Sequence, residues 1–164
     1  MPSSKLYAAL NEQLRYEFQS AYLYLGMAAH FEHEDLAGFA SFLRAQVAEE
    51  RDHAFRFFDF ILHAGGRPEL AGLEGTRTEY ASALEVFQLA LGHERKITAQ
   101  IHKLMDLAIA ERDHAAAAFL QWFVTEQVEE EATFGRIVHR LELAGNAPGA
   151  LLMVDRELGA RTAK

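Results

Sequence analysis

Four glutamates interrupt apolar, helix-spaced patterns, one in each of four long stretches of the chain. They are Glu17, Glu50, Glu94 and Glu130. At alternating spacings of three and four, the first stretch reads Leu10, Leu14, Glu17, Ala21, Tyr24, Ala28. This spacing places side chains on the buried face of a helix, where an isolated carboxylate is costly unless it is paired or bound to a metal. Four of them predict a shared ligand at the centre of a helical bundle.

A histidine and a glutamine accompany these glutamates. His53 follows Glu50 by three residues, and Gln127 precedes Glu130 by three, so each pair shares one helix face and can reach one ion. No Lys or Arg occupies the four apolar patterns, so the four carboxylates keep a formal charge of −4. Two divalent cations would neutralise that charge. The alternative is a metal-free helical scaffold in which the carboxylates share protons.

The types of ligand restrict the metal. Carboxylates with one imidazole favour hard or borderline ions such as Fe(II) and Mn(II). The chain has no cysteine, which excludes thiolate zinc sites, iron–sulfur clusters, disulfides and thiol catalysis. Two close metal ions bridged by a carboxylate favour redox chemistry with oxygen species, because two irons can each give up one electron.

The tetrapeptide Glu-Arg-Asp-His occurs twice, so a Glu-x-x-His pair is weak evidence by itself. The second copy runs from Glu111 to His114 and lies at an expected turn between helices, outside the apolar patterns. We expect Asp113 to cap the following helix and His114 to be solvated.

Four further residues each have two possible roles. Tyr24, one heptad after Glu17, could hydrogen-bond a metal ligand or pass an electron, or it could be a core aromatic with a satisfied hydroxyl. Glu49, Glu126 and Glu129 lie one step round their helices from the central set. They could form an additional metal site or a solvated acidic face.

Composition sets the wider limits. The chain has 164 residues, half of them hydrophobic, which suits a single domain over 1–164 with a sizeable core. Sixteen basic against 24 acidic residues give a net charge of −8, which favours cations as ligands and argues against nucleic acid. No apolar run approaches the roughly 18 residues of a membrane span, and the N-terminus lacks a signal-peptide core. We expect no membrane association and a cytoplasmic location.

The same patterns predict an all-α fold. We expect helices near residues 4–33, 36–64, 82–111, 113–145 and 149–159. Asp35 and Asp113 are predicted N-caps, and Ser82 opens a capping box with Glu85. Gly65 and Gly66 end the second helix.

Loop lengths predict the topology. The first and third connections are short, so each joins an antiparallel hairpin. A helix of 28 residues is about 42 Å long, and the connection over 65–81 can extend to about 56 Å. The second and third helices can therefore be parallel, joined by one long crossover. That arrangement places one carboxylate from every helix in one layer.

On these residues the chain resembles the bacterial non-haem ferritins over essentially its whole length. Glu17, Glu50, His53, Glu94, Gln127 and Glu130 look like the complete ferroxidase centre of that family. Tyr24 matches the tyrosine beside that centre, and Glu49, Glu126 and Glu129 match the third iron site of bacterial members. Two departures separate the chain from bacterioferritins. Gln127 and Glu130 replace a second Glu-x-x-His pair, and Asp52 stands where bacterioferritins carry a haem-ligating Met.

The resemblance implies a ferritin-like four-helix bundle with one long crossover and a short C-terminal fifth helix. It also implies that two Fe(II) ions per subunit, with a possible third, are oxidised by O₂ or peroxide. Fe(III) is then stored as a hydrated oxide inside a shell of twenty-four subunits. Glu17 and Glu94 would each serve one iron, Glu50 would bridge, and His53 and Glu130 would complete the two coordination spheres.

Two points stay open within the resemblance. Gln127 would be a hydrogen-bonding outer ligand. Ala117 and Leu120 stand where many members place acidic residues lining a threefold channel, so the route by which iron enters is not specified. A second possible function is a di-iron oxidase or peroxidase that reduces oxygen species without storing iron.

Overall fold

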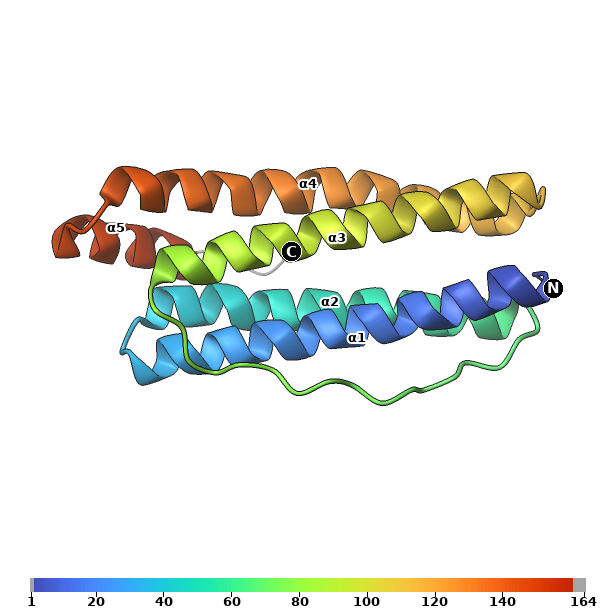
Figure 1. Ribbon diagram of the computed structural model, residues 1–164, viewed down its shortest axis with the longest axis horizontal. Helices are drawn as coiled ribbons and strands as arrows, with labels where there is room; N and C mark the ends of the chain where they lie inside the picture. The colour runs from blue at the N-terminus through green and yellow to red at the C-terminus, as the bar shows by residue number, and fades with distance from the viewer. Residues whose placement is uncertain (1, 161–164) are drawn as a thin grey trace.

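The computed structural model describes residues 2–160, which form five α-helices and no strand. The helices are α1 (Ser4–His33), α2 (Ala37–His63), α3 (Ala83–Ala110), α4 (His114–Ala144) and α5 (Pro148–Gly159). The first four lie side by side as a bundle, and α5 packs against α2 and α4 at one end (Figure 1). The predicted all-α class, with a four-helix bundle and a short fifth helix, is confirmed.

The connections arrange the bundle as two hairpins. Short turns join α1 to α2 and α3 to α4, and the segment over 64–82 runs the length of the bundle beside α1 (Figure 1). Because this crossover returns the chain to the end at which α2 began, α2 and α3 are parallel. The predicted topology is therefore the one observed.

Most of the predicted helix caps are present. Ser82 accepts a hydrogen bond from the backbone N–H of Glu85 at 3.0 Å, and Asp113 accepts one from Ala116 at 2.9 Å. Each satisfies a backbone donor that the first turn of a helix leaves unpaired.

The prediction that Asp35 caps α2 was wrong. Leu36 occupies that position, with no side-chain hydrogen bond to the helix. Asp35 instead has a φ of 57°, and the N–H of Leu36 reaches back to the carbonyl of Phe31 at 2.9 Å. This is the left-handed turn that commonly ends a helix, and Asp tolerates it better than most residues. Asp35 therefore ends α1 rather than beginning α2.

Polar side chains of α1 attach the crossover to the bundle. Tyr7, Asn11 and Gln19 accept hydrogen bonds from crossover backbone amides at 2.8, 2.6 and 2.7 Å respectively. Further along, a Cβ atom on Gly26 would lie 2.3 Å from the carbonyl oxygen of Arg77. A segment without regular structure must find partners for its backbone groups elsewhere, and α1 supplies several of them.

The apolar core is divided into two clusters. One contains Phe31, Phe39 and Phe87, and the other contains Leu14, Phe57 and Phe123. In every helix of the bundle the glutamate of the apolar pattern lies, in sequence, between the residues of one cluster and those of the other. The fold therefore encloses a polar layer between two apolar ones.

Candidate metal centre

Each bundle helix contributes one buried carboxylate to the polar layer. The exposed fractions of Glu17, Glu50, Glu94 and Glu130 are 1, 2, 1 and 4%. Among residues 2–160, no Lys or Arg forms an ion pair with any of them. The structure thus brings the four predicted glutamates together without a Lys or Arg of the described residues to neutralise them.

His53 faces two of these carboxylates. Its Nδ1 atom lies 3.7 Å from Oε2 of Glu17 and 3.5 Å from Oε2 of Glu50. Nδ1 of His53 and Oε2 of Glu17 are both buried and have no hydrogen-bond partner. Orphaned buried atoms are rare, and they are expected where a metal ion completes the site. Two carboxylates and one imidazole within 4.8 Å of one another fit a divalent cation.

A second set shares the same histidine. Ligand atoms of His53, Glu126 and Glu130 also lie within 4.8 Å of one another. Gln46 donates a hydrogen bond to Oε2 of Glu130 at 3.0 Å. His53 therefore lies between two groups of carboxylates, as expected for a site that holds more than one ion.

Tyr24 and Gln127 both contact Glu94. The fully buried Tyr24 donates its hydroxyl hydrogen bond to Oε1 of Glu94 and stacks on Phe134 with ring centroids 5.6 Å apart. It is thus both a core aromatic and a partner of a candidate ligand. Nε2 of Gln127 donates to Oε2 of Glu94 at 3.0 Å, and the outer-ligand role that the resemblance implies for Gln127 stays a prediction.

Burial shifts the protonation of the metal-free layer. Desolvation raises the pKa of Glu94 to about 7 and that of Glu130 to about 8, and it raises the pKa of Glu50 well above its ordinary value. Burial alone would lower the pKa of His53, but the adjacent carboxylates of Glu17 and Glu50 favour the charged imidazolium and raise its pKa to about 11. Without metal, the layer therefore retains protons near neutral pH. Cations that bind there must displace them.

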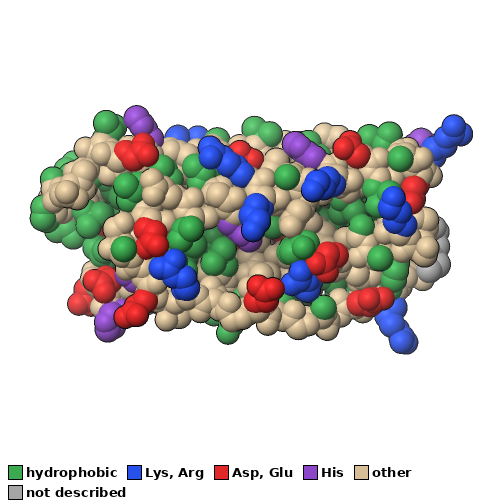
Figure 2. Space-filling view, in the orientation of Figure 1, with side chains coloured by type: hydrophobic (Ala, Val, Ile, Leu, Met, Phe, Trp, Pro, Cys, Tyr) green, Lys and Arg blue, Asp and Glu red, His purple; other side chains and the backbone are tan. Residues whose placement is uncertain are grey.

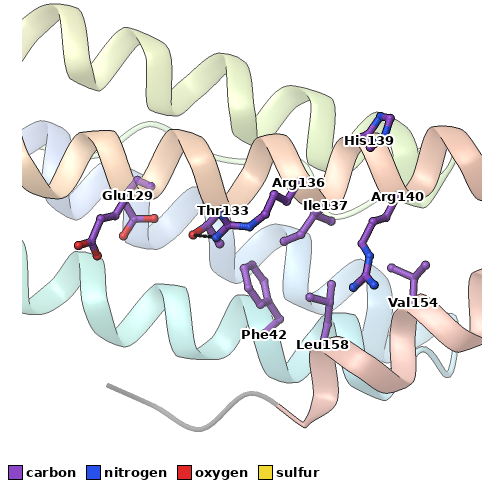
Figure 3. A pocket seen from close by; sticks show the side chains of 10 residues that line it. Phe42, Glu129, Thr133, Arg136, Ile137, His139, Arg140, Val154 and Leu158 are labelled. Carbon is purple, nitrogen blue, oxygen red and sulfur yellow. Dashed lines mark hydrogen bonds between the residues drawn. The ribbon is translucent and has the colours of Figure 1, made fainter.

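The three flanking carboxylates do not form one compact set. Glu126 is half-buried and joins His53 and Glu130, whereas neither Glu49 nor Glu129 belongs to either three-residue set found among the described residues. Glu129 is exposed and lines a groove of about 540 Å³ between α2, α4 and α5, together with Arg136 and Arg140 (Figure 3). A third metal site at these residues stays a prediction.

The second Glu-Arg-Asp-His copy lies away from the layer. Its Asp113 caps α4, and its His114 is exposed, as the sequence predicts. Leu120, by contrast, is fully buried in the core. It is therefore enclosed within the subunit rather than displayed on its surface, while Ala117 is half-buried.

Sequence reasoning missed two polar residues of the layer, Gln13 and Gln46. Gln13, 3% exposed, donates a hydrogen bond to Oε1 of Glu17 at 2.7 Å. The available signal was its position one helical turn before Glu17, on the same face of α1. Gln46 lies one helical turn before Glu50, but its contact with Glu130 on another helix could not be read from spacing.

One face of the bundle carries acidic and basic side chains together. On the face in Figure 2, acidic and basic side chains are interspersed along the bundle, and neither sign forms a continuous patch. None of the helices in residues 2–160 has an apolar stretch long enough to cross a membrane.

A family model describing a ferritin-like domain matches residues 7–144. The chain belongs to the ferritin family. The bacterial non-heme ferritin of Staphylococcus aureus (strain USA300) is 36% identical over 162 residues, which cover 99% of this chain and 98% of the relative. The corresponding protein of Staphylococcus epidermidis is 38% identical over the same shares of both chains.

Solved ferritins share the fold closely. An open-pore ferritin from the hyperthermophilic archaeon Archaeoglobus fulgidus matches with a TM-score of 0.97 and 44% identity, covering 99% of each chain. A closed form engineered from the A. fulgidus ferritin by site-directed mutagenesis matches with a TM-score of 0.97 and 43% identity over 100% of each chain. Family and fold together support iron binding and, in general terms, a role in iron storage and oxidation for this ferritin.

Proposed function

We propose that this ferritin oxidises Fe(II) to Fe(III) at a di-iron centre within each subunit and stores the product as a ferric oxide mineral. The observation that supports the proposal best is the buried layer of four carboxylates, one from each helix, none of which forms an ion pair with a Lys or Arg of the described residues. An uncompensated buried charge of this size is costly, and two divalent cations remove the cost.

Iron is the substrate here, and the chain supplies its ligands. Glu17 and His53 hold one Fe(II), Glu94 and Glu130 hold the other, and Glu50 bridges them. Gln127 fixes the Glu94 carboxylate through its hydrogen bond. Tyr24 holds the other carboxylate oxygen of Glu94, and its hydroxyl can pass an electron from there. Because Glu50, Glu94 and Glu130 have raised pKa values without metal, Fe(II) binding releases protons.

The oxidation step balances with O₂ as the acceptor. Two Fe(II) ions release one electron each, and these two electrons with two protons reduce one O₂ to one H₂O₂. Peroxide can replace O₂ as the acceptor, and it is then reduced to water. Holding both irons in one buried layer allows both electrons to reach one acceptor molecule.

We further propose that the whole chain, 1–164, acts as one ferritin-like domain in a cytoplasmic, hollow homo-oligomer of twenty-four subunits. The match to ferritins over 98–99% of both chains supports this assembly. The mineral would form in the enclosed space, to which the irons move after oxidation.

Removing a proposed ligand tests the centre directly. We expect His53→Ala and Glu17→Ala each to slow rapid Fe(II) oxidation by about tenfold or more in stopped-flow measurements while assembly persists, since each removes a ligand from the buried layer. His114→Ala is the matched control, because it alters the identical tetrapeptide at an exposed position. Oxidation at the parent rate in both layer variants would exclude these residues from the centre.

A further inference from the structure

Three of the four carboxylates in the layer each receive a hydrogen bond from a neutral glutamine amide. Gln13 donates to Oε1 of Glu17 at 2.7 Å. Gln46 donates to Oε2 of Glu130 at 3.0 Å, and Gln127 donates to Oε2 of Glu94 at 3.0 Å. Glu50, the proposed bridge, instead lies 3.5 Å from Nδ1 of His53.

Gln13 and Gln46 are as deeply buried as the carboxylates they contact. Their exposed fractions are 3% and 0%. Burying an amide at this depth is unfavourable unless it is hydrogen-bonded. Gln13 reaches Glu17 one turn along α1, whereas Gln46 reaches from α2 to Glu130 on α4. Two independent elements therefore supply the same type of donor to the layer.

A neutral donor can hold a carboxylate oxygen without cancelling the negative charge of the layer. Lys or Arg could hold the same carboxylate oxygen, but each would cancel one negative charge and so weaken the attraction for cations. An amide N–H fixes the oxygen and leaves the charge of the layer intact. Glutamine therefore preserves the negative charge that attracts two divalent ions to the layer.

The amide also selects which oxygen faces the metal. On Glu17, Oε1 is engaged by Gln13, while Oε2 is buried without a hydrogen-bond partner and lies 3.7 Å from Nδ1 of His53. A carboxylate held in this way presents a single oxygen to an ion. Without the amide, the side chain could rotate and present both.

We propose that Gln13 and Gln46 are positioning residues of the di-iron centre, each holding one ligand carboxylate so that it presents one oxygen to its metal ion. The proposal rests on the proposed function, in which Glu17 and Glu130 bind different ions. Gln13 therefore sets the affinity of the Glu17–His53 position, and Gln46 sets that of the Glu94–Glu130 position.

Stepwise titration of the metal-depleted, full-length protein with Co(II) tests this without relying on oxidation. The absorption bands of Co(II) report both occupancy and coordination geometry. Gln13→Met and Gln46→Met keep the length of the side chain but remove its N–H donor. We expect each variant still to bind two Co(II) ions per subunit, with one of the two bound about tenfold or more weakly and with altered band shape.

Gln100→Met is the matched control. Gln100 lines the same crevice of about 210 Å³ between α1 and α3 as Gln13, and its Oε1 is buried without a hydrogen-bond partner. Its titration should match that of the parent protein. Gln13→Asn and Gln46→Asn provide a second pair of variants, which keep the amide but shorten its reach by one methylene. They should reproduce the weakening even where a methionine disturbs packing.

The possible results are distinct. If the parent binds two Co(II) ions and all four Gln13 and Gln46 variants bind them with unchanged affinity and band shape, the positioning role is wrong while the centre stands. An equal loss of Co(II) affinity in Gln100→Met would also overturn the positioning role, since the effect would then come from the crevice as a whole. A parent protein that binds no Co(II) in the layer would overturn the proposed function itself.

Discussion

At the scale of single residues, buried glutamates of the layer make the stability of the metal-free protein depend on pH. In the folded, metal-free state the pKa is about 7 for Glu94 and about 8 for Glu130, both raised by burial. The folded protein therefore binds more protons than the unfolded chain between the ordinary glutamate pKa and these values. In that interval the free energy of unfolding falls as pH rises.

This linkage gives a pH prediction for the metal-depleted protein. Raising the pH from about 6 to about 9 should lower its free energy of unfolding. His53 contributes in the same direction, because a folded pKa of about 11 means that its stabilisation is lost as pH rises. Urea denaturation across this range measures the slope, and saturating Zn(II) should largely abolish it.

The double substitution Glu94→Gln and Glu130→Gln should make the slope shallower, since neither amide titrates. Replacing the exposed Glu79 by Gln is the matched control and should leave the slope unchanged. A metal-free parent protein whose stability increases over this range would contradict the assignment of protons to the layer.

A separate prediction concerns a third metal position at the flanking carboxylates. Replacing Glu49, Glu126 and Glu129 together by Gln should leave two tight Fe(II) or Zn(II) positions per subunit and abolish a third. The iron-to-oxygen stoichiometry should change more than the initial rate, because the pair of ions that meets oxygen is retained. Anomalous diffraction from metal-soaked crystals measures occupancy directly. No third ion in the parent protein, at concentrations that fill the main pair, would make these residues a solvated acidic face.

Single-residue chemistry could be predicted from sequence where it depends on one helix. The spacing of Glu50 and His53 and the polar interruption in each apolar pattern were sufficient to propose the central layer. The contact from Gln46 to Glu130 joins two helices, and its existence depends on how α2 and α4 are rotated about their axes. No local pattern encodes that rotation.

At the scale of elements, helix positions followed from periodicity, whereas turns and the crossover depended on contacts between elements. Asp35 shows the difference, since its sequence context fits both an N-cap and the left-handed end of a helix. The path of the crossover along α1 depends on Tyr7, Asn11 and Gln19. These residues have no apolar pattern that would have identified them beforehand.

Two glycine substitutions test the packing of the crossover. Gly26→Ala places a methyl group 2.3 Å from a backbone oxygen of the crossover, so it should lower the free energy of unfolding by about 1–3 kcal/mol. Gly92→Ala meets nothing within 4 Å. Because Gly92 lies within α3, Gly92→Ala should raise the free energy of unfolding by about 0.5–1 kcal/mol. Chemical denaturation of both variants gives the comparison, and equal signs for the two changes would contradict close packing at Gly26.

At the scale of the whole molecule, the polar layer lies between two apolar clusters that account for most of the core. These clusters provide the hydrophobic stabilisation, so the layer can hold uncompensated charge without being the main source of stability. This division is the reason that ligand substitutions are expected to alter oxidation while the fold and assembly persist.

The size and iron content of the native particle distinguish storage from oxidation alone. We expect size-exclusion chromatography with light scattering to give about twenty-four times the subunit mass of 18.4 kDa. Aerobic Fe(II) loading should leave far more iron per subunit than the two ions of the centre, because oxidised iron moves on to a mineral and vacates its ligands. Glu17→Ala should form the same particle and fill it more slowly. A small dimer that oxidises Fe(II) but retains no mineral would instead indicate a di-iron oxidase or peroxidase, and the storage role would be wrong while the centre remained valid.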